Sequence, residues 1–229
     1  MNIVHICDNL TKKIKKIFQL LYFFLIQKPI YCLSYNGDGN QFSCKGYLLN
    51  SSVLITGRNN RLIIKEGCRL CNTSIVVSGE GNVVILDNRV VFTEGGRIRV
   101  EDNRNRLLIG KDSNMINCFF SISDDDSKIE IGKECLFSAN VIVRNSDSHS
   151  ILNNEGQRIN FSKDVIIGDH VWLAYGVTIL KGCVIGQDSI VGSNSLLSNF
   201  KGDPNSIIVG NPAKCVKTGV NWDVSRIPR

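Results

Sequence analysis

Apolar residues recur at every sixth position of the chain from Val165 onward. The stretch VIIGDH VWLAYG VTILKG CVIGQD SIVGSN SLLSNF divides into six blocks. The third place of each block holds an aliphatic residue: Ile167, Leu173, Ile179, Ile185, Val191 and Leu197. A helix needs apolar spacing near 3.6 residues and a strand meander turns at irregular intervals, so neither fits. The pattern predicts a solenoid whose blocks are each a short strand and a corner, with these side chains stacked from coil to coil.

A longer repeat precedes these blocks. It reads NRLII at Asn60, NVVIL at Asn82, NRLLI at Asn105 and SKIEI at Ser127. Asn and Gly before each strand suit the left-handed backbone of tight corners. We therefore predict an all-β protein with one continuous parallel β-helix over residues 50–200, preceded by a basic amphipathic segment at 1–49 and followed by a C-terminal segment at 201–229.

The repeat is interrupted once, by RNSDSHSI at residues 144–151. This stretch is almost wholly polar, whereas the blocks around it keep a regular apolar spacing. A rigid repetitive wall that opens into a polar loop is a suitable support for a functional group. We expect residues 144–163 to form such a loop.

The basic residues are most concentrated in the N-terminal segment. The net charge is +6, and the densest basic group is Lys12, Lys13, Lys15 and Lys16, followed by the apolar run Ile17–Ile26. This run is too short to span a bilayer and no signal-peptide cleavage site follows it. Two interpretations stay open: an amphipathic helix that contacts a membrane surface through residues 11–30, or a helix that packs on the end of the main domain. Only 7% of residues are aromatic, and no basic platform interleaved with aromatic residues follows, which disfavours nucleic acid as a partner.

The cysteines indicate reduced thiols and a cytoplasmic protein. There are nine, an odd number without the spacing of a disulfide framework. Cys68 and Cys71 form the only CxxC pair, and a zinc site would need a second pair or nearby histidines. We predict small buried residues there and no metal.

Four motifs together resemble the hexapeptide-repeat acyltransferases, and most closely the O-acetyltransferases of bacterial capsule and lipopolysaccharide glycans. These motifs are the six-residue blocks, SDSHSI, GDHVWLAYG and the closing GNPAK at 210–214, and the likeness spans about residues 115–218. The resemblance implies a left-handed β-helix, a homotrimer with active sites between subunits, acetyl-CoA in the groove between two helices, and a glycan acceptor. It also implies an enzyme that works in the cytoplasm, at the inner membrane face where glycans are built.

The same resemblance assigns the chemistry. Transfer of an acetyl group to a hydroxyl needs a base, and histidine is the natural base near neutral pH. His149 stands where the family has its catalytic histidine and Trp172 where it has an active-site tryptophan. Asn145 and Asp147 are candidates for orienting the ring of His149 or binding the acceptor. His170 is the rival base, although it lies within the repeat.

The remaining site residues also come from the resemblance. Asn117 falls near an acceptor-side asparagine of some sugar acetyltransferases. The positions that bind coenzyme A in relatives correspond here to Ala174, Tyr175, Ser193, Ser198, Lys214 and Lys217. Small residues leave backbone amides accessible to the pantetheine chain, and lysines suit its phosphates. Lys201 is a further candidate for a phosphate contact, because Asn199 stands where many relatives have lysine.

Two other functions stay open at this level. The same scaffold and donor serve N-acetylation of an amino sugar or another small acceptor, and a β-helix can also be a non-catalytic scaffold. Metal-dependent hydration chemistry is disfavoured, because the chain lacks a His-x4-His pair.

Overall fold

The computed structural model describes residues 31–228. The amphipathic helix predicted around residues 11–30 therefore lies outside the described residues. From Tyr31 onward every regular element is a β-strand. Within this part of the chain no helix is long and apolar enough to cross a membrane.

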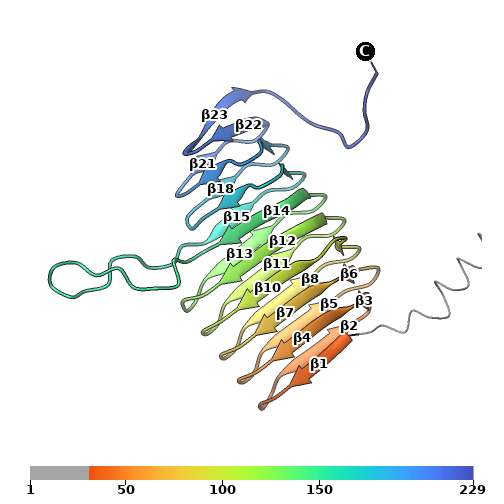
Figure 1. Cartoon of the computed structure of the whole chain (residues 1–229), viewed down its shortest axis with the longest axis vertical. Coiled ribbons are helices and arrows are strands. Elements are labelled where there is room, and N and C mark those ends of the chain that lie inside the picture. The colour runs from red at the N-terminus through yellow and green to blue at the C-terminus, as the bar shows by residue number, and fades with distance from the viewer. Residues whose placement is uncertain (1–30, 229) are drawn as a thin grey trace, which may run out of the picture. The chain divides into compact units, whose positions relative to one another are not determined.

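The strands wind into a parallel β-solenoid with three walls (Figure 1). Wall I contains β2 Gln41–Cys44, β5 Arg61–Ile64, β8 Val83–Leu86, β11 Arg106–Ile109, β13 Lys128–Ile131, β15 Val165–Ile167, β18 Val184–Ile185 and β21 Lys201–Gly202. Wall II contains β3 Tyr47–Leu49, β6 Arg69–Cys71, β9 Val91–Phe92, β16 Trp172–Leu173, β19 Ile190–Val191, β22 Ser206–Gly210 and β23 Ala213–Thr218. Wall III contains β1 Tyr31–Tyr35, β4 Ser51–Ile55, β7 Thr73–Val77, β10 Gly96–Val100, β17 Thr178–Ile179 and β20 Leu196–Leu197.

Two long strands, β12 Asn114–Ile122 and β14 Leu136–Arg144, run through both wall II and wall III. The start of β14 pairs with β16, and its end pairs with β17. The chain thus passes from wall I through a first corner to wall II, through a second corner to wall III, and through a third corner back to wall I. The β-solenoid begins before residue 50, because β1 already pairs with β4 and β2 with β5.

The core is the column of inward side chains that the six-residue spacing predicts. All six aliphatic residues of the blocks are buried, with exposures of 2% or less. The smaller residues two places before them are also buried: Val165, Val171, Val177, Cys183, Ser189 and Ser195. In the middle coils three phenylalanines fill the interior, with ring centroids 6.2 Å apart for Phe92 and Phe120 and 6.3 Å apart for Phe120 and Phe137. The hexapeptide solenoid is confirmed.

The asparagines before the upstream strands form a buried ladder. The Oδ1 atom of Asn60 accepts the amide of Asn82 at 2.9 Å, and the Oδ1 atom of Asn82 accepts the amide of Asn105 at 2.8 Å. The left-handed backbone belongs to the preceding residues, such as Asn59 and Gly81. The left-handed backbone expected of Asn and Gly at these corners is therefore present, but not at the strand-leading asparagines, because their side chains are needed inside the corner as hydrogen-bond partners.

Two segments leave the regular coil (Figure 1). Residues 145–164 connect β14 to β15 at the third corner and project outward as a long loop, closed near its tip by an antiparallel bridge between Leu152 and Arg158. After β22 the chain reverses at Asn211 and Pro212 into the antiparallel strand β23, and a C-terminal tail follows.

Seven cysteines of the described residues are free thiols. The Cys68 thiol is buried and donates to the Asp87 carbonyl at 2.9 Å.

Candidate active site

His149 lies on the exposed side of the projecting loop. The segment from Asp147 to Ile151 is solvent-exposed, and Ser148 has a left-handed backbone with φ of 66°. The loop occupies the interval between Arg144, where β14 ends, and Val165, where β15 begins on wall I. Its sequence therefore escapes the six-residue spacing, and His149 is free to reach beyond the surface of the coil.

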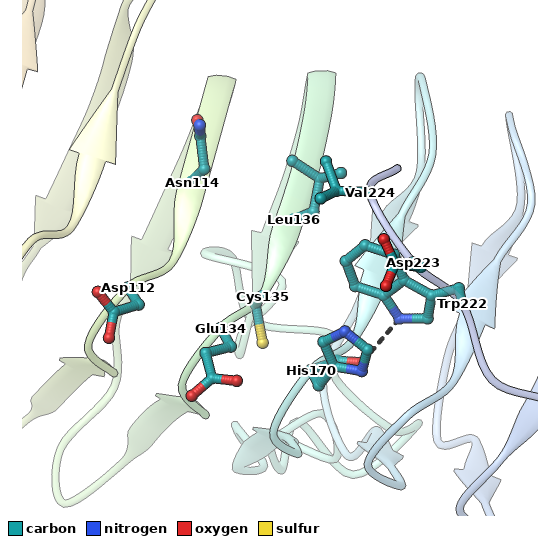
Figure 2. A pocket seen from close by; sticks show the side chains of 9 residues that line it. All are labelled: Asp112, Asn114, Glu134, Cys135, Leu136, His170, Trp222, Asp223 and Val224. Carbon is teal, nitrogen blue, oxygen red and sulfur yellow. Dashed lines mark hydrogen bonds between the residues drawn. The ribbon is translucent and has the colours of Figure 1, made fainter. Parts of the chain in front are cut away.

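The other described histidine is fully engaged. His170 lies at the first corner, with its Nδ1 atom 2.9 Å from Asp188 Oδ1. The ring of Trp222, from the C-terminal tail, stacks on it with centroids 4.2 Å apart and planes 6° apart. Figure 2 shows this stack and the hydrogen bond from Trp222 Nε1 to the His170 carbonyl, which measures 2.8 Å. These contacts make His170 an anchor for the tail and leave its ring poorly placed to meet a substrate.

Asp147 connects the loop to the coil. Its carboxylate accepts hydrogen bonds from Lys181 Nζ, at the third corner of the next coil, and from Asn160 Nδ2. Burial raises the pKa of Asp147, but these hydrogen bonds and the positive charges of Lys181 and Arg144 outweigh it, so the pKa lies below its ordinary value. Asp147 therefore stays ionised and is bound to Lys181 and Asn160, not to the ring of His149.

Asn145 is part of the wall. Its side chain is fully buried. Its Oδ1 accepts the Ser123 amide and its Nδ2 donates to the Ser123 carbonyl, each at 3.0 Å. Both of its polar atoms thus secure the start of the loop to the preceding coil.

Trp172 projects outward from wall II, between Leu136 and Ile190 of the neighbouring coils. Its ring lies 5.8 Å from that of Trp222. Within the described residues its indole Nε1 is buried without a hydrogen-bond partner. Trp172 therefore leaves the coil on wall II, whereas His149 leaves it beyond wall III, so one chain does not bring these two residues to the same wall.

Three of the predicted donor-binding residues share the second corner. Ala174 and Tyr175 form this corner in one coil and Ser193 in the next, and the two coils are joined by the Asn194 amide bonding to the Tyr175 carbonyl at 2.8 Å. The Ala174 amide is used inside the coil, where it donates to the Val191 carbonyl. The amides of Tyr175 and Ser193, both on exposed residues, make no backbone hydrogen bond within the described chain.

The other predicted donor-binding residues lie elsewhere. Ser198 is at the third corner, where the loop begins, and its neighbour Asn199 accepts a hydrogen bond from Lys163 Nζ at 2.8 Å. Lys214 and Lys217 lie on β23, opposite Val209 and Ile207. Both lysines are exposed, and neither forms an ion pair with another described residue.

Asn117 lies at the second corner too, one coil before Asn140. Asn117 pairs in register with Ala139 of the next coil. Asn140, beside Ala139, donates a hydrogen bond from its Nδ2 atom to the hydroxyl of Tyr175 at 2.8 Å. Asn117 lines a hollow of about 350 Å³ together with Arg97 and Phe119. The guanidinium of Arg97 lies 5.6 Å from the centre of the Phe119 ring, and Arg97 has no ion-pair partner among the residues described.

Three residues that the sequence did not reveal complete this picture: Trp222, Asn160 and Lys181. Trp222 gave the only usable signal, as the single aromatic residue after Phe200. A hollow of about 320 Å³ beside it is lined by Asn114, Glu134 and Asp223, which Figure 2 shows around the His170 stack. Asn160 and Lys181 had no signal, because polar loop residues usually contact only solvent.

Comparison with known proteins identifies the family and the fold. The family described as bacterial transferase hexapeptide (six repeats) matches residues 164–199. A polysialic acid O-acetyltransferase of Neisseria meningitidis is 36% identical over 177 residues, which cover 76% of this chain and 81% of that protein. A putative lipopolysaccharide biosynthesis O-acetyl transferase of Escherichia coli K12, WbbJ, is 26% identical over 164 residues, 68% of this chain and 81% of that protein.

Two solved structures share the fold over most of the chain. The polySia-specific acetyltransferase NeuO superposes with a TM-score of 0.76 at 31% identity and covers 85% of this chain and 89% of its own. The polysialic acid O-acetyltransferase OatWY gives a TM-score of 0.63 at 31% identity, with 86% and 92% covered.

Proposed function

This chain belongs to the hexapeptide-repeat O-acetyltransferases, and from this premise we propose that it transfers an acetyl group from acetyl-CoA to a hydroxyl of a capsular or lipopolysaccharide glycan. The observation that carries the proposal is the placement of His149. Of the two described histidines, it alone has an exposed side chain on a loop that is fixed to the wall at its base, while the ring of His170 is held by Asp188 and Trp222.

His149 is the proposed general base. Its imidazole takes the proton of the acceptor hydroxyl while the oxygen attacks the thioester carbonyl. The new C–O bond forms, the C–S bond breaks, and the proton passes from the imidazolium to the departing thiolate. A positioned base of this kind contributes about 10²- to 10⁴-fold to the rate.

The donor fits the second corner and β23. The amides of Tyr175 and Ser193 are the donors that pantetheine carbonyl groups require, and they repeat in consecutive coils, about 4.8 Å apart. Lys214 and Lys217 supply positive charge for phosphates from the adjacent strand. Ser198 lies at the third corner, apart from these donor-binding residues of the same chain.

The acceptor fits the hollow beside Asn117. The Asn117 side chain can exchange hydrogen bonds with sugar hydroxyls, and the Glu94 carboxylate of the same hollow can accept them. The guanidinium of Arg97, which has no ion-pair partner among the described residues, suits a carboxylate. Arg97 therefore favours an acidic glycan. This agrees with the polysialic acid in the names of the similar proteins.

We further propose a homotrimer in which neighbouring chains complete each active site. Support comes from the separation of His149 and Trp172 on different sides of one coil. The loop also exposes a group of apolar side chains that a neighbouring chain would cover: Ile151, Leu152, Ile159 and Phe161. Trp172 would then face the acceptor and thioester beside the His149 of the adjacent subunit.

The test is release of the coenzyme A thiol by purified protein with acetyl-CoA and a panel of glycans that includes polysialic acid and lipopolysaccharide. Thiol release should depend on the glycan, and mass spectrometry should find an acetyl ester on it. His149→Ala should lower kcat by about 10²- to 10⁴-fold, whereas Ser150→Ala, its exposed neighbour, should not. Full activity of His149→Ala, or no glycan-dependent release with any acceptor, would overturn the proposal.

A further inference from the structure

One buried side-chain amide binds the loop before, at and after His149. Asn160 lies on the returning arm of the loop and is only 8% exposed. Its Nδ2 donates to the His149 carbonyl and to Asp147 Oδ2, each at 2.8 Å. Its Oδ1 accepts the Ile151 amide at 2.7 Å. A single side chain therefore binds three alternate residues centred on His149.

Asn160 is itself attached to the rigid coil. Lys181 Nζ donates to the Asn160 carbonyl at 3.3 Å as well as to the carboxylate of Asp147. Lys181 belongs to the third corner, and its side chain is only 14% exposed. The backbone of His149 is thus hydrogen-bonded to Asn160, and Asn160 in turn to Lys181 of the wall.

Asp124 secures the same arm of the loop from the preceding coil. Its Oδ2 atom accepts Arg158 Nη2 at 2.6 Å and the Ser162 amide at 3.0 Å. These contacts lie two residues before and two residues after Asn160. The arm therefore cannot shift without breaking bonds to both neighbouring coils.

The side chain of Asn153 lacks this connection. Asn153, near the tip, also folds back on its own loop, and its Oδ1 accepts the amides of Glu155 and Gln157 at 3.0 and 2.9 Å. Its side chain forms hydrogen bonds only with Glu155 and Gln157 among the described residues. Asn153 thus accepts only from the neighbouring residues of the loop tip, whereas the Asn160 side chain bonds across the loop to the segment that carries His149.

We propose that Asn160 is a positioning residue for His149, an inference that rests on the proposed role of His149 as the base. The three hydrogen bonds set the direction in which the backbone presents the imidazole. A displacement of about 1 Å at a reacting group can lower the rate on the order of 10²-fold. Asn160→Asp keeps the acceptor for Ile151 but places a carboxylate against the Asp147 carboxylate and the His149 carbonyl, so it should be no better than alanine.

The first test is kinetic, with acetyl-CoA and the best acceptor of the glycan panel. Asn160→Ala and Asn160→Asp should lower kcat by roughly 10- to 100-fold and change the KM for acetyl-CoA by less than about twofold, because the donor groove is elsewhere. Asn153→Ala, the matched control, should keep wild-type kcat. An unchanged kcat in Asn160→Ala would overturn the inference.

A double-mutant cycle separates positioning from a general loss of structure. If Asn160 acts through His149, adding Asn160→Ala to His149→Ala should cost no further activity. An equal fold-loss in both backgrounds would show that Asn160 acts through something else and would overturn the proposal.

Hydrogen exchange tests the same contact without catalysis. The Ile151 amide should exchange at least about tenfold faster in Asn160→Ala than in wild type, while Val143 and Val165 in the flanking strands stay protected. If the Ile151 amide is unaffected, the positioning inference fails even when His149 is the base. If exchange accelerates but His149→Ala is fully active, the proposed function fails instead. Loss of protection in the flanking strands would mark misfolding, and Asn160→Ser would then replace alanine in all three tests.

Discussion

Replacing Asn82 with alanine removes a central rung of the asparagine ladder. The side chain is completely buried. Its Nδ2 donates to the carbonyls of Ser78 and Asp102 at 2.9 and 2.8 Å, and its Oδ1 accepts the Asn105 amide at 2.8 Å. Alanine leaves the Asn105 amide and the carbonyls of Ser78 and Asp102 without these partners.

The expected loss follows from these three groups. A buried amide without an acceptor costs about 1–3 kcal/mol, and each lost bond to a carbonyl about 1 kcal/mol, so Asn82→Ala should lower the free energy of unfolding by about 3–5 kcal/mol. Asn82→Ser should lose less, because the chain itself has serine at this place of the ladder, where the Ser127 amide bonds to Asn105 Oδ1 at 2.9 Å. Asn154→Ala, at the exposed loop tip, is the matched control and should stay within about 0.5 kcal/mol of wild type.

Urea unfolding followed by circular dichroism measures this difference. Protein concentration must be held constant, because association contributes to the stability of an oligomer. Hydrogen exchange at the Asn105 amide reports the same rung locally and should accelerate in Asn82→Ala. The reasoning is refuted if the alanine variant unfolds at the same urea concentration as Asn154→Ala and the Asn105 amide stays protected.

Three further predictions follow from the site. Trp222→Ala removes the stack on His170 and the bond to its carbonyl, so the tail should detach, with a loss of about 1–2 kcal/mol and earlier tryptic cleavage at Arg226; cleavage as slow as in wild type would contradict the stack. Because the pKa of Asp147 is lower in the folded chain than in the unfolded one, its ion pair with Lys181 should stabilise the protein fully above about pH 4 and progressively less as the pH falls through the lowered value. The difference in unfolding midpoint between wild type and Lys181→Met should therefore vanish at low pH, and a constant difference would exclude Asp147 as the partner. Burial raises the pKa of Cys118 and Cys135 to about 12, so iodoacetamide at pH 8 should alkylate the exposed Cys215 and spare both of them, as peptide mass spectrometry can show.

The sequence predicts the coil well because its signal is local and repeated. Leu173, Ile179 and Ile185 each face the interior for the same reason, and one strict spacing suffices to place them all. The upstream corners were harder, since neighbouring residues such as Asn59 and Asn60 have equal preference for a left-handed backbone. Only the three-dimensional ladder decides that Asn60 turns inward and Asn59 takes the positive φ.

The candidate site was less predictable because its contacts are long-range. Trp222 meets His170 across 52 residues and Lys181 meets Asp147 across 34, and no spacing rule connects such pairs. Asn145 illustrates the converse: it resembled a polar loop residue beside His149, yet both of its polar atoms belong to the wall.

Mixing two inactive variants tests the central claim most directly. His149→Ala and Trp172→Ala chains, co-expressed in equal amounts, should each be inactive alone. If every site takes His149 from one chain and Trp172 from its neighbour, random trimers should regain about one quarter of the wild-type sites, and acetyl transfer from acetyl-CoA to the glycan should recover to that fraction. Native mass spectrometry confirms that mixed trimers have formed. Recovery near 25% supports a histidine base acting at a shared site, whereas mixed trimers as inactive as either variant would contradict it.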